Sequence, residues 1–203
     1  MQILRYPLGQ MQANCYMLLS GSDCLIIDPG DSADFILEEV SRRNLTVHGV
    51  VATHGHFDHI MAAGEIVMAL GCPFYINPKD WFLVERLEST AQHFLGFEPQ
   101  VIKPPSHEPI PKGIGPFAFQ TLHTPGHTPG STCLHFTREG ILFTGDTLFA
   151  NAIGRYDFSY SDKRELKQSL TKIFALPAET IVRPGHGDET YVGIEVKNMP
   201  HVF

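Results

Sequence analysis

Short apolar runs and longer mixed segments alternate along this chain, and the two patterns predict different elements. Mostly apolar runs such as residues 15–19 and 141–144 are typical of buried strands, and Pro29-Gly30 ends another such run. Residues 33–43 instead carry apolar side chains at helical spacing with charges between them, as amphipathic helices do. On this basis the predicted strands are residues 3–6, 15–19, 25–28, 47–52, 73–76, 117–122, 132–136, 141–144 and 180–183, and the predicted helices are residues 33–43, 60–70, 77–87, 162–176 and 191–197.

The order of these elements predicts the fold class. Strands and helices occur in both halves of the chain, which suggests an α/β protein in which two packed sheets carry helices on their outer faces. Such an arrangement has four layers. No shift in composition marks a boundary, so we expect a single domain over residues 1–203.

Residues 89–112 differ from the rest because they contain Pro99, Pro104, Pro105, Pro109 and Pro111. They are predicted to form a loop that is too long for a simple connection. Loops of this length in compact domains are usually lids or binding loops. A solvated insertion without a function is the other interpretation, and the sequence does not decide between them.

Composition and charge narrow the classes of partner. The chain is 43% hydrophobic and 18% charged, as globular proteins are, and its net charge of −7 with no Lys/Arg cluster argues against nucleic acid. No apolar stretch reaches membrane-spanning length, and the N-terminus lacks the features of a signal peptide. The four scattered cysteines suggest reduced thiols. We therefore expect a cytoplasmic protein that binds a small-molecule substrate and neither nucleic acid nor membrane, with its oligomeric state open.

The strongest chemical signal is residues 53–59, Thr-His-Gly-His-Phe-Asp-His, which follow the predicted strand 47–52. Imidazole and carboxylate groups are ligands that borderline divalent metal ions prefer. Three later segments repeat the design, in which a strand ends near a glycine and a His or Asp follows. The candidate ligands are His54, His56, Asp58, His59, His127, Asp146 and His186.

Seven ligands exceed the four that one tetrahedral ion takes, so they suit two metal ions with one shared carboxylate. We assign the shared position to Asp146, because a carboxylate can bridge two ions and an imidazole normally cannot. Metal binding lowers the pKa of water from 15.7 to roughly 7, so hydroxide bound between the two ions exists at neutral pH. Asp58 is the candidate catalytic residue that orients this water or moves its proton.

These motifs resemble those of the metallo-β-lactamase superfamily, and most of all its binuclear glyoxalase II-like hydrolases. The similarity runs from Asn14-Cys15-Tyr16 and Asp28-Pro29-Gly30 to Pro184-Gly185-His186-Gly187. It implies a four-layer αββα sandwich and two divalent metal ions, zinc first, with iron or manganese as alternatives. It also implies that His54, His56 and His127 bind one ion, that Asp58, His59 and His186 bind the other, and that Asp146 bridges them.

Particular residues favour one branch of this superfamily. β-Lactamase-like members lack the bridging aspartate, and lactonase-like members usually place a tyrosine just after it, where this chain has Thr147. Gly154-Arg155-Tyr156-Asp157 resembles a segment common in glyoxalase II-like and persulfide dioxygenase-like proteins. Full-length glyoxalase II has a C-terminal helical extension that holds glutathione. This chain stops at Phe203, which leaves glutathione recognition open.

The leading hypothesis is therefore a metal-dependent hydrolase of a small thioester or ester. The alternative is a persulfide dioxygenase-like oxidoreductase with one iron held by His54, His127 and Asp146, an arrangement open to oxygen. A binding module that has lost activity is disfavoured because all seven ligands are present. Nuclease activity is disfavoured by the acidic charge.

Several other residues have two possible roles. His123 and Asp28 can support the ligands or only shape turns, and Arg155 can clamp a substrate carboxylate or pair with Asp157, which we favour. Phe149 and Tyr156 are candidate pocket walls, and Asp188 is expected to be solvated. Surface or ordinary core positions are expected for the histidines that match no motif, His48, His93, His107, His135 and His201.

Overall fold

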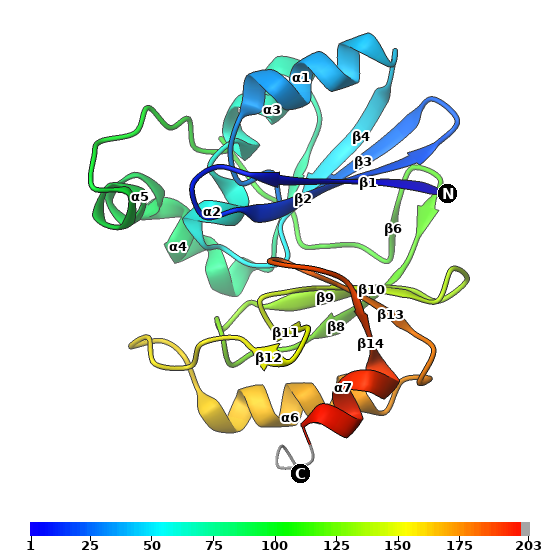
Figure 1. Ribbon diagram of the computed structural model, residues 1–203. Helices are drawn as coiled ribbons and strands as arrows, with labels where there is room; N and C mark the ends of the chain where they lie inside the picture. Colours follow the sequence, from blue (N-terminus) through cyan, green and yellow to red (C-terminus); the bar gives the residue numbers. More distant parts are fainter. Residues whose placement is uncertain (200–203) are drawn as a thin grey trace.

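Two five-stranded sheets face each other in the computed structural model, which describes residues 1–199 (Figure 1). Helices α1 (Ala33–Arg42) and α3 (Ala63–Leu70) lie outside the first sheet, and α6 (Lys163–Phe174) and α7 (Val192–Asn198) lie outside the second. The predicted four-layer α/β arrangement is therefore confirmed. Among the described residues, no helix combines the length and the apolar character needed to cross a membrane.

The first sheet comes from the N-terminal half, in the spatial order β1-β2-β3-β4-β5. The first three strands pair antiparallel, whereas β4 pairs parallel with both β3 and β5. Its strands are β1 (Gln2–Leu8), β2 (Ala13–Ser20), β3 (Asp23–Ile27), β4 (Thr46–Val51) and β5 (Phe74–Tyr75).

The second sheet comes from the C-terminal half, in the order β14-β13-β10-β9-β8. Only β10 and β13 run parallel within it. Its strands are β8 (Gln120–His123), β9 (Thr132–Phe136), β10 (Ile141–Gly145), β13 (Ile181–Pro184) and β14 (Thr190–Tyr191). Two small strand pairs lie outside the main sheets, β6 (Gly113–Ile114) with β7 (Phe117–Ala118) and β11 (Leu148–Phe149) with β12 (Ala152–Ile153).

Alternation along the central strands explains why these runs are apolar at every position. On β2, Cys15 and Met17 belong to the cluster under α1 and α3, whereas Tyr16 and Leu18 belong to the cluster between the sheets. A third cluster joins the second sheet to α6 and α7. Because successive side chains of a strand point to opposite faces, a strand with helices on one side and a sheet on the other must be apolar on both.

The segment after β5 departs from its prediction. Its helices are η1 (Pro78–Asp80), α4 (Trp81–Glu85) and α5 (Leu87–Leu95), so residues 89–95 are helical and not part of a loop. Leu87 and Ala91 are both buried at helical spacing on α5, whereas the prolines begin only at Pro99. The predicted helix 60–70 is also split, into α2 (Phe57–Ile60) and α3.

The remaining part of the predicted loop lies against the first sheet. Glu108 donates its N–H to Phe74 O at 2.9 Å and accepts one from Ile76 at 3.1 Å, so the backbone runs beside β5. A Cβ added at Gly64 of α3 would lie 1.8 Å from Ile102 O, which shows how closely the segment packs there. The segment is thus tied to the first sheet and to α3. The last residues, 200–203, which include His201, lie outside the described residues.

Candidate metal centre

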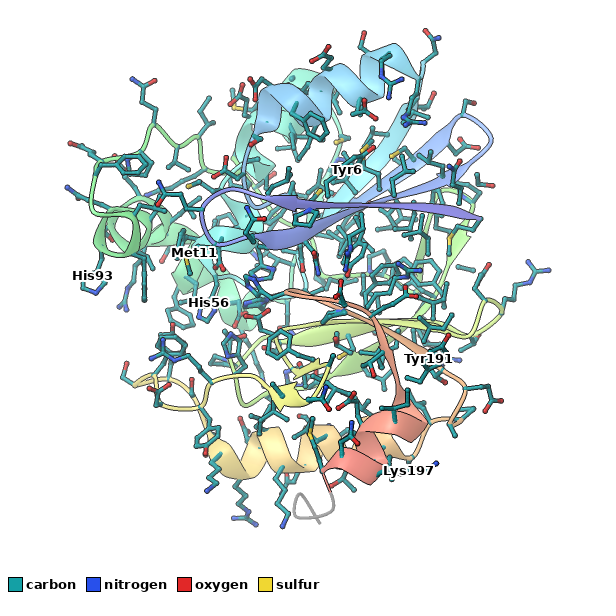
Figure 2. The ribbon with its side chains drawn as sticks, in the orientation of Figure 1. Tyr6, Met11, His56, His93, Tyr191 and Lys197 are labelled. Atoms are coloured by element: carbon teal, nitrogen blue, oxygen red, sulfur yellow. The ribbon has the colours of Figure 1, made fainter. Side chains whose placement is uncertain are left out.

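Four segments that follow β4, β8, β10 and β13 meet at one end of the sandwich, and the first of them includes helix α2, on which Asp58 and His59 lie. These segments bring together all seven side chains that the sequence analysis selected, in two groups whose donor atoms lie within 4.8 Å of one another. Figure 2 shows His56 between the two sheet layers, whereas His93 points outward from α5. The first group is His54, His56, His127 and Asp146, and the second is Asp58, His59 and His186.

Three imidazole nitrogens converge in the first group. His56 Nδ1 lies 3.1 Å from His54 Nε2 and 2.9 Å from His127 Nε2. All three imidazole side chains are buried. Two ligands placed 2.05 Å from a tetrahedral ion are about 3.3 Å apart, so this spacing fits a shared ion.

The second group combines imidazole with carboxylate. His59 Nε2 lies 3.3 Å from His186 Nε2, and Asp58 Oδ2 lies 3.2 Å from His186 Nε2 and 3.8 Å from His59 Nε2. His59 is fully buried, whereas the side chain of His186 is 28% exposed. These distances also fit one ion, at a position closer to solvent.

Asp146 faces both groups. Its Oδ1 lies 3.3 Å from His59 Nε2, and its Oδ2 lies 3.6 Å from His127 Nε2 and 3.7 Å from His186 Nε2. Oδ1 is buried and has no hydrogen bond within residues 1–199. A buried carboxylate oxygen without a hydrogen bond is costly unless a cation satisfies it, and the chemistry of the surrounding donors suits such a cation.

Asp28 orients two of the imidazoles through their outer Nδ1 atoms, His59 directly and His54 through Thr53. It accepts hydrogen bonds from Thr53 N and Thr53 Oγ1, both at 2.7 Å, and its Oδ2 lies 3.2 Å from His59 Nδ1. Thr53 Oγ1 lies 3.2 Å from His54 Nδ1. With these outer nitrogens protonated, the inner Nε2 atoms are free to bind a metal. The interpretation of Asp28 as a hydrogen-bond partner of the His-rich loop is confirmed.

The other two imidazoles of the first group have different partners. His127 Nδ1 donates to Arg155 O at 2.8 Å, and His56 Nε2 lies 2.9 Å from the hydroxyl of Tyr160. His56 therefore presents Nδ1 to the group, whereas His54 and His127 present Nε2. Sequence reasoning missed Tyr160, because it lies 104 residues from His56 in a segment without a motif.

Asp80 was missed too, although it joins two of the loops. It is fully buried at the end of η1 and accepts hydrogen bonds from Gly55 N at 2.9 Å, Gly130 N at 2.6 Å and Thr128 Oγ1 at 2.6 Å. These contacts fix the His-rich loop against the loop that carries His127. An acidic residue in the first turn of a predicted helix gives no sequence signal for such a role.

The balance of burial and charge lowers the pKa values of His54 and His56 in the first group and raises those of His59 and His186 in the second. Burial lowers the pKa of His54 and lowers that of His56 to about 3. Burial would also lower the pKa of His59, but the Asp146 and Asp58 carboxylates outweigh it and raise the pKa. Burial would lower the pKa of His186 too, but its hydrogen bond to Asp58 and the charges of Asp146 and Asp58 together outweigh burial and raise it. Burial favours a neutral Asp146, but nearby imidazoles, His59 above all, hold its pKa well below the usual value.

Both groups open into a cavity of about 480 Å³. His56, Asp58, His127, Asp146 and His186 line this cavity. Most of the remaining wall is apolar, and Thr90 and Phe94 show that α5, in the segment predicted to be a loop, contributes to it. The apolar and aromatic residues of the wall are Met11, Phe57, Phe94, Phe149, Ala150, Ile153, Phe158 and Tyr160.

The structure distinguishes between the two roles predicted for each of several residues near the site. Arg155 makes two hydrogen bonds of 2.9 Å to the carboxylate of Asp157, which is the internal pair that we favoured. Phe149 lines the cavity, but Tyr156 is not among the described lining residues. The centroid of its ring lies instead 5.3 Å from Lys163 Nζ.

His123 Nε2 donates to Pro129 O at 2.9 Å, so it supports the loop that carries His127 rather than a ligand directly. Asp188 is 87% exposed and pairs with Arg5.

Comparisons with known proteins agree with this geometry. Residues 8–186 match the family model of the metallo-beta-lactamase superfamily. The chain is 37% identical to the probable metallo-hydrolase YqgX of Bacillus subtilis, over 97% of this chain and 95% of the relative. It is 34% identical to the hydroxyacylglutathione hydrolase GloC of Haemophilus influenzae, over 98% and 97% of the two chains.

Solved structures share the fold over nearly the whole chain. The BLEG-1 B3 metallo-beta-lactamase superimposes with a TM-score of 0.90 at 34% identity and 99% coverage of both chains. TTHA1623 in a di-iron-bound form gives a TM-score of 0.88 at 36% identity, with 96% of this chain and 98% of that chain covered.

Proposed function

The chain belongs to the metallo-beta-lactamase superfamily and has its fold, and from this we propose that it is a metal-dependent hydrolase of a small thioester or ester. The resemblance inferred from the motifs is thereby confirmed at the level of the family. The substrate, the number of metal ions and the role of each residue are parts of the proposal.

One observation carries the proposal. Seven donors lie in two groups beside a cavity that five of them line, and Asp146 lies within 3.7 Å of imidazole nitrogens from both groups. This supports two ions with a shared carboxylate. We assign one ion to His54, His56 and His127, the other to Asp58, His59 and His186, and the bridging position to Asp146.

Two divalent ions would supply an acidified water and polarise the substrate's carbonyl oxygen. The protein's part is to hold the ligands, to orient the water and to exclude competing solvent. We assign the orientation of the water, or the transfer of its proton, to Asp58, because its carboxylate belongs to the half-buried group at the cavity. Thr53, Asp28 and Arg155 O keep the outer imidazole nitrogens of the ligands protonated.

The size and lining of the cavity support a small acyl substrate. A volume of about 480 Å³ lies within the usual range for small-molecule sites, and a mostly apolar wall suits an acyl chain better than a highly charged group. The relative named as a hydroxyacylglutathione hydrolase supports a thioester in particular. We therefore place thioesters before simple esters.

The number of metal ions that the site binds distinguishes the two candidate reactions. An oxidoreductase with one iron would use His54, His127 and Asp146 and leave the second group without a role. The donor distances within that second group favour two ions and hydrolysis. We propose zinc, and the di-iron form of TTHA1623 makes iron the first alternative to measure.

The test combines elemental analysis with a substrate screen. Purified protein is analysed for zinc, iron and manganese and assayed against thioesters, esters, lactones, phosphodiesters and β-lactams, with oxygen consumption followed in parallel. We expect two metal ions per chain and preferential thioester hydrolysis. One iron per chain with oxygen uptake, or two metals with activity only on phosphodiesters or β-lactams, contradicts the proposal.

A further inference from the structure

Tyr160 lies in the cavity wall, and the proposed function leaves its hydroxyl group unused. Its only hydrogen-bond partner within residues 1–199 is His56 Nε2, at 2.9 Å. The side chain is half-buried, so its ring is packed while part of it faces the cavity.

The direction of that hydrogen bond follows from the proposed metal binding. His56 Nδ1 lies within 3.1 Å of two other inward-facing imidazole nitrogens and must be unprotonated for this group to hold an ion. A neutral imidazole carries one N–H, so the proton of His56 is on Nε2 and is donated to Tyr160. The Tyr160 oxygen is the acceptor, and its own O–H remains available as a donor.

The surrounding rings hold this hydroxyl in place. Phe158 stacks on the Tyr160 ring with centroids 5.4 Å apart, and Phe82 meets it edge-on at 5.5 Å. A hydroxyl on a ring fixed from two sides loses little freedom when it binds a ligand.

We propose that the Tyr160 hydroxyl donates a hydrogen bond to an oxygen substituent on the acyl group of the substrate, and so selects 2-hydroxyacyl or 2-oxoacyl over unsubstituted acyl groups. The His56 ring, with 2.9 Å on the side of the hydroxyl and 2.9–3.1 Å on the side of the other imidazole nitrogens, separates this hydroxyl from the converging donor atoms. Tyr160, His56 and His127 line the same cavity, so the hydroxyl is placed for a substituent next to the reacting carbonyl and not for the carbonyl oxygen itself. The inference deepens the proposed function and rests on it. It makes Tyr160 a specificity-determining residue.

The test is the variant Tyr160→Phe, with Tyr156→Phe as the matched control. Both changes remove one hydroxyl from the same segment, but Tyr156 is exposed and does not line the cavity. Lactoyl and propionyl thioesters of one thiol differ only in the 2-hydroxyl group. Loss of one neutral hydrogen bond should lower kcat/KM of Tyr160→Phe for the lactoyl thioester about three- to tenfold, leaving the propionyl value and the metal content unchanged.

A binding measurement separates this inference from the proposed hydrolysis. Lactohydroxamate and propionohydroxamate bind metal ions and differ by the same oxygen, so their affinities for metal-loaded protein can be measured by calorimetry without turnover. Tyr160→Phe should weaken only the lactohydroxamate, by a similar factor. If no thioester is hydrolysed, the proposed function fails while this pair still tests Tyr160.

Three results overturn the inference. In the first, Tyr160→Phe is indistinguishable from Tyr156→Phe. In the second, it loses activity equally toward both acyl groups. In the third, it loses metal together with activity. The last result would show that Tyr160 only positions His56.

Discussion

The two donor groups differ in how they are held and in the charge they carry without metal. The first places three buried imidazoles together, and burial lowers the pKa values of His54 and His56. The second places His59 and His186 beside two carboxylates, which raise the pKa of both. His54 and His56 are therefore neutral and close to their metal-binding form, whereas the second group is held together by charge pairs.

This difference teaches how two adjacent metal sites can be built from the same residue types. A metal ion that enters the first group displaces few protons, because His54 and His56 are already neutral. An ion that enters the second group must displace protons from His59 and His186. The first group is thus a preformed site, and the second is stabilised before the metal arrives by interactions that the metal then replaces.

The most severe test of the comparison removes the carboxylate that both groups face. We expect Asp146→Ala to lose metal from both groups and to lower kcat by on the order of a thousandfold or more, because metal ions contribute several kcal/mol to such reactions. Elemental analysis and steady-state kinetics measure both effects. Retention of one full equivalent of metal would show that the two groups do not share this residue.

Asp58→Ala tests the second group alone. This variant should lose one metal ion and nearly all turnover while the first group keeps its ion. Asp34→Ala, in the exposed first turn of α1, is the matched control and should leave both quantities unchanged. Full activity with both metals retained would refute the role assigned to Asp58.

Gly185→Ala tests packing in place of charge. A Cβ at this position would lie 2.3 Å from Asp146 Oδ1 and 2.6 Å from His59 Cε1, so it must displace the shared carboxylate or the second group. We expect a ten- to hundredfold loss of metal affinity, of the order seen when ligand support is disturbed. In Gly187→Ala the new Cβ meets nothing within 4 Å, so that variant reports only the strain of a φ of +72°. Equal losses in both variants would contradict the steric explanation.

Asp80→Asn tests the support of the first group. The side-chain NH2 group of the new Asn would point at the backbone N–H of Gly130 or Gly55, so two donors would face each other without an acceptor. We expect this to cost about 1–3 kcal/mol of stability and to weaken metal binding about tenfold. Thermal unfolding and competition with a chelator measure the two effects. If the second group lost metal first, Asp80 would not be specific to the first.

The smallest expected effect is the dependence of the stability of the metal-free protein on pH. His59 and His186 have raised pKa values, so their stabilising contribution is complete below about pH 6.5 and is lost as the pH rises through the folded values. His54 and His56 have lowered values, so they reduce stability as the pH falls from about 6.5 toward 3. His59→Gln should lessen the decline in Tm on the alkaline side only. A decline there as steep as in the wild type would contradict the assignment.

Much of the fold and of the donor set followed from local pattern. The runs that became β2 and β10 were mostly apolar because both of their faces are covered. The spacing within residues 53–59 placed four donors directly after one strand, two in a loop and two on α2, and each later donor stood just after a strand. The helical nature of residues 89–95 was missed, because the prolines that follow drew the predicted loop back over a segment that Leu87 and Ala91 anchor to the core.

The sequence by itself determined which elements form and which side chains stand at their ends. Hydrophobic periodicity and the Gly and Pro residues that end elements are local properties of the chain. Only the tertiary structure decided that Asp80 joins two loops and that Tyr160 lies against His56. These contacts connect residues 25 to 104 positions apart, so they depend on which loops the packing of the two sheets brings together, and no local pattern encodes that distance.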